Sequence, residues 1–208
     1  MSHITRSKEM LWQAGCETVL AAPQNYIDID VEADGIAGHG SLLAIGAQAP
    51  TGESYYSEIR PAFAEFLQGH RDFCDTHGLD HERLMDEARE YRQVIPEFIE
   101  WLESLKSENG NKPPVFTAFN ASFDFAFIDL YCAKLGINNP FGIASFDLKS
   151  YAAQLSGDHD WTKTRKSQLP PEILPEGDFT HHALEDAQYQ QKLHFGMVAL
   201  LGSKVIIC

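Results

Sequence analysis

The chain has 208 residues, of which 44% are hydrophobic and 22% charged, and its formal net charge is −14. These values are typical of an ordinary globular domain, and no apolar run reaches the ~20 residues that a membrane-spanning helix needs. The acidic balance argues against a broad basic footprint for long duplex DNA, because such proteins bind mainly by neutralising phosphates. The 4 cysteines show no CxxC spacing, which favours reduced thiols in a cytoplasmic protein over a zinc site.

The first part of the chain predicts a helix and then a meander of strands. Residues 1 to about 24 are expected to form a helix and an irregular lead-in that ends near Pro23. In residues 26–35 apolar side chains alternate with acids, which is typical of a β-strand with two unlike faces. Residues 40–48 and 53–61 predict two more strands, and the Gly and Pro residues between the strands favour antiparallel pairing.

The second part alternates helices with short strands. The predicted elements are a helical region over 81–110, a strand over 113–120, a helix over 122–136, a strand and helix within 143–157, and a helix over 181–202. Pro96 predicts that a fresh helix starts there. Gly136 is expected to close its helix, and Asp147 to cap the next one.

The order of these elements predicts the fold class. Strands in a meander, followed by strand–helix alternation, indicate an α/β fold in which helices cover a mixed sheet of antiparallel and parallel strands. No repeat, low-complexity tract or linker divides the chain. One domain is therefore expected over residues 25–202, after a lead-in over 1–24 and before a tail over 203–208.

The strand over residues 26–35 should place three carboxylates on one face. Asp28, Asp30 and Glu32 alternate with apolar residues, so successive carboxylates lie roughly 6–7 Å apart at ~3.3 Å per residue. Like charges at that separation repel, and burying them is costly unless positive charge joins them. Taken alone, such a strand is best interpreted as a solvated acidic face.

Two further acids lie where helices are expected to begin. Asp124 comes just after the strand over 113–120, in the first turn of a helix, where a carboxylate is electrostatically favoured. Asp186 lies in the first turns of the last helix. Each could be an ordinary acid at a helix start, which is how we interpret Glu185.

Together these acids resemble the three motifs of the DEDD exonuclease superfamily, in its His-containing branch (DEDDh), which has a ribonuclease H-like fold. The motifs occur in the family's order as Asp30-Val31-Glu32, then Asn120-Ala121-Ser122-Phe123-Asp124, then His181 with Asp186 after four intervening residues. The resemblance spans roughly residues 24–200. Proteins of this superfamily include the polymerase proofreading subunit, ribonuclease T and oligoribonuclease.

The resemblance implies that Asp30, Glu32, Asp124 and Asp186 bind two Mg²⁺ or Mn²⁺ ions. Such hard cations prefer oxygen ligands, and their charge makes a cluster of acids tolerable. Two such ions can activate a water and stabilise the leaving oxygen of a phosphoryl displacement. Asp28 lies outside the family motif, and we interpret it as a structural strand residue.

The resemblance also implies that His181 is the general base, since histidine titrates near neutral pH and can accept a proton from the attacking water. Helical spacing alone favours its neighbour. His182 and Asp186 are four residues apart and would share one helical face, whereas His181 and Asp186 are five apart. We follow the family pattern and expect His181 on the loop that enters the helix.

The segment between Gly157 and the last motif carries an aromatic residue beside clustered cations. Trp161 could stack on a base while Lys163, Arg165 and Lys166 follow phosphates. A solvated loop with a partly buried Trp is an equally good interpretation. The candidate substrate contacts are these four residues and Phe123.

The resemblance implies a metal-dependent 3'-5' exonuclease, and the cysteine pattern favours the cytoplasm. Its substrates would be free 3' ends of single-stranded RNA or DNA, or short oligonucleotides, with no membrane partner and with a homodimer as a candidate assembly. Two alternatives stay open. One is a phosphodiesterase for small nucleotides, which the net charge of −14 would suit. The other is a non-catalytic nucleic-acid-binding or protein-binding module, which the presence of all four acids and His181 disfavours.

Overall fold

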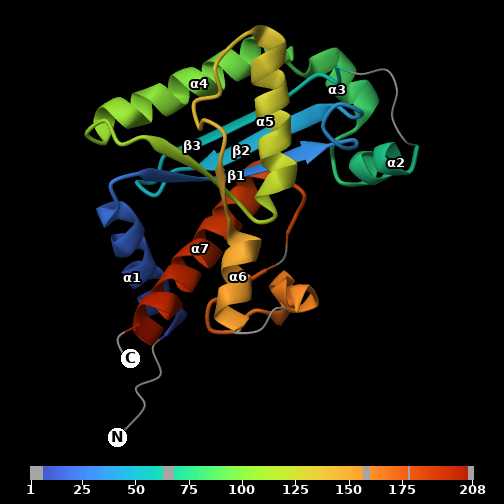
Figure 1. The fold of residues 1–208 in the computed structure, drawn as a ribbon. Helices are drawn as coiled ribbons and strands as arrows, with labels where there is room; N and C mark the ends of the chain where they lie inside the picture. Colours follow the sequence, from blue (N-terminus) through green and yellow to red (C-terminus); the bar gives the residue numbers. More distant parts are fainter. Residues whose placement is uncertain (1–6, 63–67, 157–159, 178, 206–208) are drawn as a thin grey trace, which may run out of the picture.

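β1 (Asn25–Ala33) lies at the centre of a five-stranded sheet in the computed structural model, which describes residues 7–62, 68–156, 160–177 and 179–205 (Figure 1). The strand order is β3-β2-β1-β4-β5. The other strands are β2 (Leu42–Gln48), β3 (Ser54–Glu58), β4 (Pro114–Ala118) and β5 (Ser145–Asp147). β1, β2 and β3 pair antiparallel, whereas β1, β4 and β5 pair parallel, which confirms the predicted mixed sheet.

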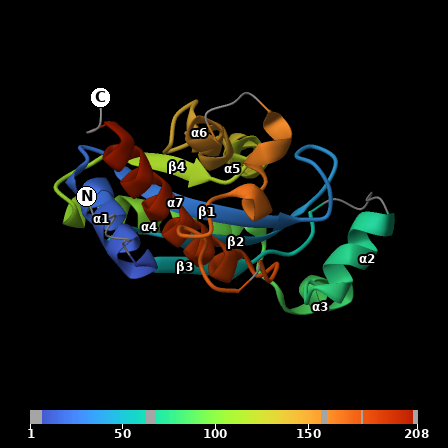
Figure 2. The ribbon, with the colours of Figure 1, turned by 90° about the horizontal axis from the view of Figure 1, so that it is seen from below.

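Helices cover both faces of the sheet (Figures 1 and 2). α4 (Tyr91–Glu108) and α5 (Ala121–Leu135) lie over one face. The other face carries α1 (Lys8–Ala21), α6 (Leu148–Ser156) and α7 (Ala183–Val205). The short helices α2 (Gln68–Thr76) and α3 (His81–Glu87) lie beyond the end of β1. In the described residues, no helix combines the length and apolarity needed to cross a membrane.

The two faces of β1 differ as its alternating sequence predicts. Ile27, Ile29 and Val31 belong to the main apolar core, together with residues of α4 and α5. The acids between them face the side on which α7 packs against β1. One strand therefore supplies both a core and a row of carboxylates, because successive side chains point to opposite faces.

α7 crosses the sheet at very close range. A Cβ added at Gly46 on β2 would lie 2.1 Å from the backbone carbonyl carbon of Ala183, the first residue of α7. A Cβ at Gly15 on α1 would lie 1.8 Å from the carbonyl oxygen of Phe195 on α7. The two glycines let backbone approach backbone: Gly46 where the start of α7 crosses β2, and Gly15 where α1 packs against the middle of α7.

The helical region over 81–110 differs from the prediction. α3 ends at Glu87 and α4 begins at Tyr91, so the prediction that Pro96 starts the fresh helix was wrong. The break comes earlier because Arg89 bridges to Ile59, and the Arg60 N–H donates to the Arg89 carbonyl at 2.8 Å. Pro96 is tolerated inside α4, where the carbonyl that it cannot pair belongs to the exposed Arg92.

Two local predictions are confirmed. Gly136 ends α5 in the left-handed region at φ +66, and its N–H donates to the carbonyls of Ala133 and Cys132. Asp147 caps α6, since its carboxylate accepts the N–H groups of Lys149 at 3.2 Å and Ser150 at 3.1 Å. α2 and the two 3₁₀ turns over Trp161–Thr164 and Lys166–Gln168 were not predicted.

Candidate active site

A cavity of ≈ 270 Å³ collects the predicted acids and His181 in one place. Its walls come from the end of β1, the start of α5, the start of α7 and the loop before α7. The residues that line it are Asp30, Val31, Glu32, Phe119, Asn120, Phe123, Asp124, Lys166, Phe179, His181 and Asp186. Motifs that lie far apart in the sequence thus meet on the α7 side of the sheet.

Asp124 is held by the strand beside it. Its Oδ1 accepts the N–H of Val31 at 3.0 Å, and the residue is 5% exposed. α5 begins after Asn120, which adopts the left-handed region at φ 73 and whose N–H donates to Asp147 at 3.0 Å. This turn places a buried carboxylate directly against the acidic face of β1.

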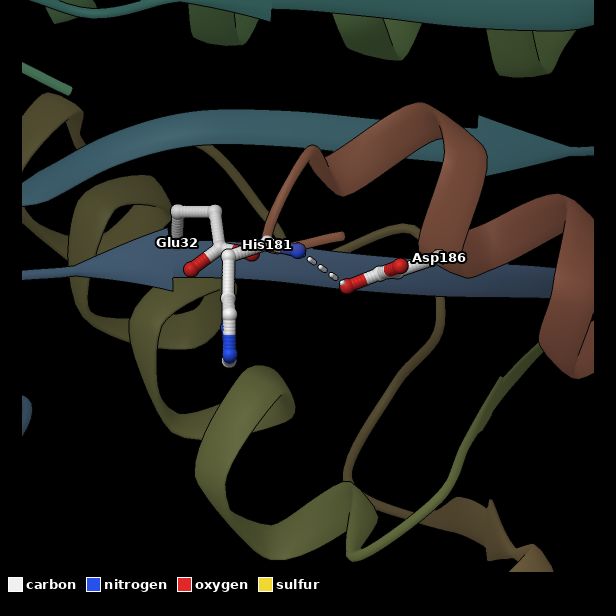
Figure 3. A group of neighbouring side chains, drawn as sticks. All are labelled: Glu32, His181 and Asp186. Atoms are coloured by element: carbon white, nitrogen blue, oxygen red, sulfur yellow. Dashed lines mark hydrogen bonds between the residues drawn. The ribbon is translucent and has the colours of Figure 1, made fainter. Parts of the chain in front are cut away.

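Asp186 is held by the loop that enters α7. Its Oδ1 accepts the Thr180 N–H at 2.8 Å, and its Oδ2 accepts the His181 N–H at 3.0 Å (Figure 3). His181 itself is left-handed at φ 59, which is uncommon for a residue other than glycine. One ligand atom from each of Glu32, His181 and Asp186 lies within 4.8 Å of the others.

The cavity has more negative charge than its own residues can stabilise. Burial, and then the charges of Asp124 and Glu32, raise the pKa of Asp30 well above its usual range. Burial and the neighbouring acids likewise raise the pKa of Glu32 to about 7. Burial raises the pKa of Asp124 to about 7 and also raises that of Asp186. The positive charge of Lys166 opposes all four shifts.

The carboxylate oxygens of the cavity form a set of metal ligands that suits a divalent cation. Across the described ranges, neither Asp30 nor Glu32 has a hydrogen-bond partner for its carboxylate, so lone pairs are left to face the cavity. Asp124 and Asp186 add carboxylates that backbone N–H groups already orient. Carboxylate oxygens in this number are the ligands that Mg²⁺ and Mn²⁺ prefer.

The two adjacent histidines have different surroundings. The ring of His181 lines the cavity and contacts two other rings, Phe73 of α2 at 4.9 Å and His77, in the turn after α2, at 4.6 Å between centroids. Burial, and then the charge of His77, lower the pKa of His181. The ring of His182 instead stacks on Tyr56 at 4.4 Å, and its Nδ1 accepts the Glu185 N–H at 3.5 Å. His182 therefore belongs to the start of α7.

The predicted substrate contacts separate into two groups. Phe123 and Lys166 line the cavity, and the Lys166 ammonium lies over the rings of Phe119, at 5.0 Å, and Phe179. Trp161, Lys163 and Arg165 are exposed and do not line it. The ring of Trp161 is covered by the ammonium of Lys149 at 4.5 Å. Sequence reasoning included Asn120 in the second motif, but it did not predict four other neighbours of the site, which are Phe119, Phe179, Phe73 on α2 and His77 just after α2.

Asp28, the third acid of the β1 face, lies outside this cavity. Its side chain is 1% exposed, and its Oδ2 is 3.2 Å from Nδ1 of His194 on α7. This placement agrees with the interpretation of Asp28 as a strand residue rather than as a ligand of the cavity.

Comparison with known proteins finds similarity to 3'-5' exonucleases and to a DNA polymerase. Residues 25–196 match the model of a family described as the 3'-5' exoribonuclease Rv2179c-like domain. The 3'-5' DNA exonuclease Cap18 of Escherichia coli is 33% identical over 182 residues, which cover 86% of this chain and 94% of Cap18. The PolC-type DNA polymerase III of Staphylococcus aureus is 27% identical over 124 residues, which cover 58% of this chain and 8% of the polymerase.

Solved structures show the same fold. The nuclease domain of 3'hExo, a DEDDh family member bound to rAMP, aligns with a TM-score of 0.65 at 17% identity. The alignment covers 84% of this chain and 91% of the 3'hExo chain. Pop2p of S. pombe, in its Mg²⁺- and Mn²⁺-bound form, aligns with a TM-score of 0.60 at 10% identity. The alignment covers 91% of this chain and 89% of the Pop2p chain. At these identities the likeness concerns the fold, which is the ribonuclease H-like fold of DEDDh nucleases.

Proposed function

Because this chain belongs to the Rv2179c-like family of 3'-5' exonucleases, we propose that its acidic cavity hydrolyses the terminal phosphodiester bond of single-stranded nucleic acid with two divalent cations. The observation that carries the proposal is the convergence of four carboxylates and His181 on one cavity. A strand face that would be unfavourable without cations becomes favourable when they bind.

Each residue has a role that its position supports. Asp30, Glu32, Asp124 and Asp186 would hold the ions, which supply water activation and charge stabilisation at the leaving oxygen. His181 would accept the proton of the attacking water, from a loop that its own N–H bond to Asp186 keeps in place. The rings of Phe73 and His77 limit the directions in which the His181 ring can point.

The cavity suits the end of a strand better than its middle. A volume of ≈ 270 Å³ leaves room for about one nucleotide, which Phe123 could contact through its ring and Lys166 through its charge. The net charge of −14 offers little surface for a long phosphate backbone. We therefore propose that the protein contacts only a few nucleotides, at a free, unpaired 3' end.

The sugar preference is best decided by direct comparison. The family is named for an exoribonuclease and Cap18 for a DNA exonuclease. We propose that both RNA and DNA ends enter the cavity, and that the rates on the two sugars differ by less than the rates on free and blocked ends.

The test uses RNA and DNA oligonucleotides of one sequence, labelled at the 5' end. With Mg²⁺ or Mn²⁺, we expect a ladder that shortens one nucleotide at a time from the 3' end. EDTA should stop the reaction, and a 3'-terminal phosphate should slow it strongly. Cleavage of a circular single strand, or full activity in EDTA, would contradict the proposal.

A further inference from the structure

Lys166 brings a positive charge into the acidic cavity, and no other lysine or arginine is among the described residues that line it. It begins the 3₁₀ turn Lys166–Gln168, whereas Lys163 and Arg165, its neighbours in sequence, are exposed and lie outside the cavity. The charge of Lys166 lies close enough to act on all four acids of the cavity. The position of its ammonium is therefore important for the whole site.

The ammonium of Lys166 is not paired with these acids. Among the described residues it has neither an ion-pair partner nor a hydrogen-bond acceptor. It is also not one of the fully enclosed polar atoms that lack a partner, so a ligand can reach it. Opposite charges attract more strongly in a partly buried site than in water, and an ion pair would be expected here. Another feature must therefore determine where the ammonium lies.

That feature is a pair of aromatic rings. The ammonium of Lys166 lies over the ring of Phe119 at 5.0 Å from its centroid, and over the ring of Phe179 at closer range. α7 holds both residues, because the Phe119 N–H donates to Gln190 at 2.7 Å and the Phe179 ring packs on Tyr189 at 4.8 Å. The faces of aromatic rings attract cations, so the two rings hold the ammonium beside the carboxylates without an ion pair.

The charges in the cavity favour a role of this ammonium toward the substrate. Under the proposed function, on which this inference rests, two divalent cations would balance the charge of the four carboxylates. Lys166 then adds one positive charge that no residue in the described part of the chain neutralises by an ion pair. A phosphodiester linkage carries one negative charge, which is the complement of this excess.

We propose that Lys166 binds a non-bridging oxygen of the phosphate that is cleaved, and that Phe119 and Phe179 are positioning residues that keep its ammonium off the metal ligands. An ammonium that moved onto the carboxylates would compete with divalent cations for the same oxygens. The two rings thus reserve the acids for metal ions and the ammonium for the phosphate.

Binding of adenosine 5'-monophosphate (AMP) in Mn²⁺ tests the phosphate contact without hydrolysis, because AMP contains no phosphodiester bond. Lys166→Met keeps the length of the side chain and removes its charge. In calorimetric titrations it should weaken AMP binding by about 10–100-fold, as expected for a hydrogen bond to a charged group. Lys166→Arg should restore much of this affinity. Lys192→Met, which changes an exposed lysine of α7 outside the cavity, is the matched control and should bind AMP as the wild type does.

Mn²⁺ binding without nucleotide tests the role of the rings. Lys166→Met removes a positive charge near the carboxylates, so Mn²⁺ should bind about tenfold more tightly. Phe179→Leu frees the ammonium to pair with the carboxylates, so Mn²⁺ should bind about fivefold more weakly. In the double variant no ammonium is left to compete, and this weakening should disappear. If Phe179→Leu does not fold, Phe119→Leu replaces it in the same comparison.

The two parts of the proposal can fail separately. Unchanged AMP affinity in Lys166→Met, or no saturable AMP binding by the wild type, would overturn the phosphate contact. Weaker Mn²⁺ binding in Phe179→Leu that persists in the double variant would show that the ring supports the metal site itself, and would overturn the positioning role. A wild type that binds Mn²⁺ and AMP but cleaves no oligonucleotide would instead contradict the proposed function.

Discussion

Asp30 and Glu32 are residues that cost the metal-free protein stability. Their carboxylates face the cavity without a hydrogen-bond partner in the described residues, and burial beside other acids raises the pKa of both. Ionising them therefore opposes folding, unless a cation binds the charged form. The effect of each acid should be visible in the stability of the metal-free protein as well as in the rate of catalysis.

Burial also raises the pKa of Asp124 to about 7, so Asp124→Asn tests the cost of the buried acids at one residue. The amide keeps the shape of the side chain, and its oxygen can still accept the Val31 N–H, but one negative charge is gone. Without metal, the variant should be more stable by on the order of 1 kcal/mol, which raises Tm by about 2–4 °C for a chain of this size. With Mg²⁺, its exonuclease rate should fall by several orders of magnitude.

Thermal unfolding in EDTA and a rate assay in Mg²⁺ measure the two effects. Asp86→Asn on α3 is the matched control, because this exposed acid lies outside the cavity and should change neither quantity. A lower Tm for Asp124→Asn than for the wild type in EDTA would show that the acid stabilises the fold and would contradict the account.

Variants of the two adjacent histidines should separate an effect on catalysis from an effect on stability. His181→Ala removes the proposed base and should lower kcat by about 10²–10⁴-fold. His182→Ala removes the ring that stacks on Tyr56 and accepts the Glu185 N–H, so it should cost about 1 kcal/mol of stability while kcat changes little. Steady-state kinetics and thermal unfolding of both variants check this, and a large loss of kcat in His182→Ala alone would reverse the assignment.

For individual helices and strands, the sequence correctly predicted those features that depend on contacts between neighbouring residues. The alternating face of β1, the closure of α5 at Gly136 and the cap of Asp147 on α6 depend on neighbouring residues, and all are present. The break between α3 and α4 depends on a distant strand through the Arg60 N–H and the Arg89 carbonyl. No sequence periodicity reports such a contact.

In the candidate active site, too, sequence motifs predicted some residues, whereas others depend on contacts between distant parts of the chain. Its acids could be predicted from three motifs in order. The contacts of Phe73 on α2, and of His77 just after α2, to His181 arise from tertiary packing, and α2 itself has only a short helical pattern. The basic cluster before the last motif could not be resolved by sequence. Two 3₁₀ turns direct Lys166 into the cavity and leave Lys163 and Arg165 exposed.

Gly46→Ala tests how closely α7 must approach the sheet. The new Cβ would meet the backbone of Ala183, which cannot move aside as a flexible side chain could, so α7 would have to shift with Asp186. We expect a loss of about 1–3 kcal/mol in stability and a clear drop in kcat, measured by denaturant unfolding and rate assays. Gly202→Ala, with open space at its Cβ position, should be neutral; an unchanged Gly46→Ala enzyme would refute this role of the close approach.

At the scale of the whole molecule, the raised pKa values link stability to pH and metal. The pKa values of Glu32 and Asp124 are about 7 in the folded protein, above their usual values near 4, so the native state binds more protons than the unfolded state between these limits. Stability without metal should therefore fall as pH rises from about 4 to about 7. Divalent cations bind the ionised carboxylates and should reverse this loss.

Thermal unfolding with and without Mg²⁺ at pH values across this range measures the linkage. The increase in Tm caused by Mg²⁺ should be small at acidic pH and grow toward neutral pH, because ligand that binds the native state stabilises it. In Asp30→Asn the increase should be much smaller at every pH. An increase that is equal at acidic and neutral pH would show that the ions bind elsewhere.

We propose that one acidic strand face and two helix starts together hold a pair of catalytic cations. The most direct test is a crystal structure of the protein with Mn²⁺, in which anomalous scattering locates the ions. We expect two peaks about 3.5–4 Å apart, in contact with carboxylates of Asp30, Glu32, Asp124 and Asp186. Full occupancy of Mn²⁺ at other residues, with none among these four carboxylates, would contradict it.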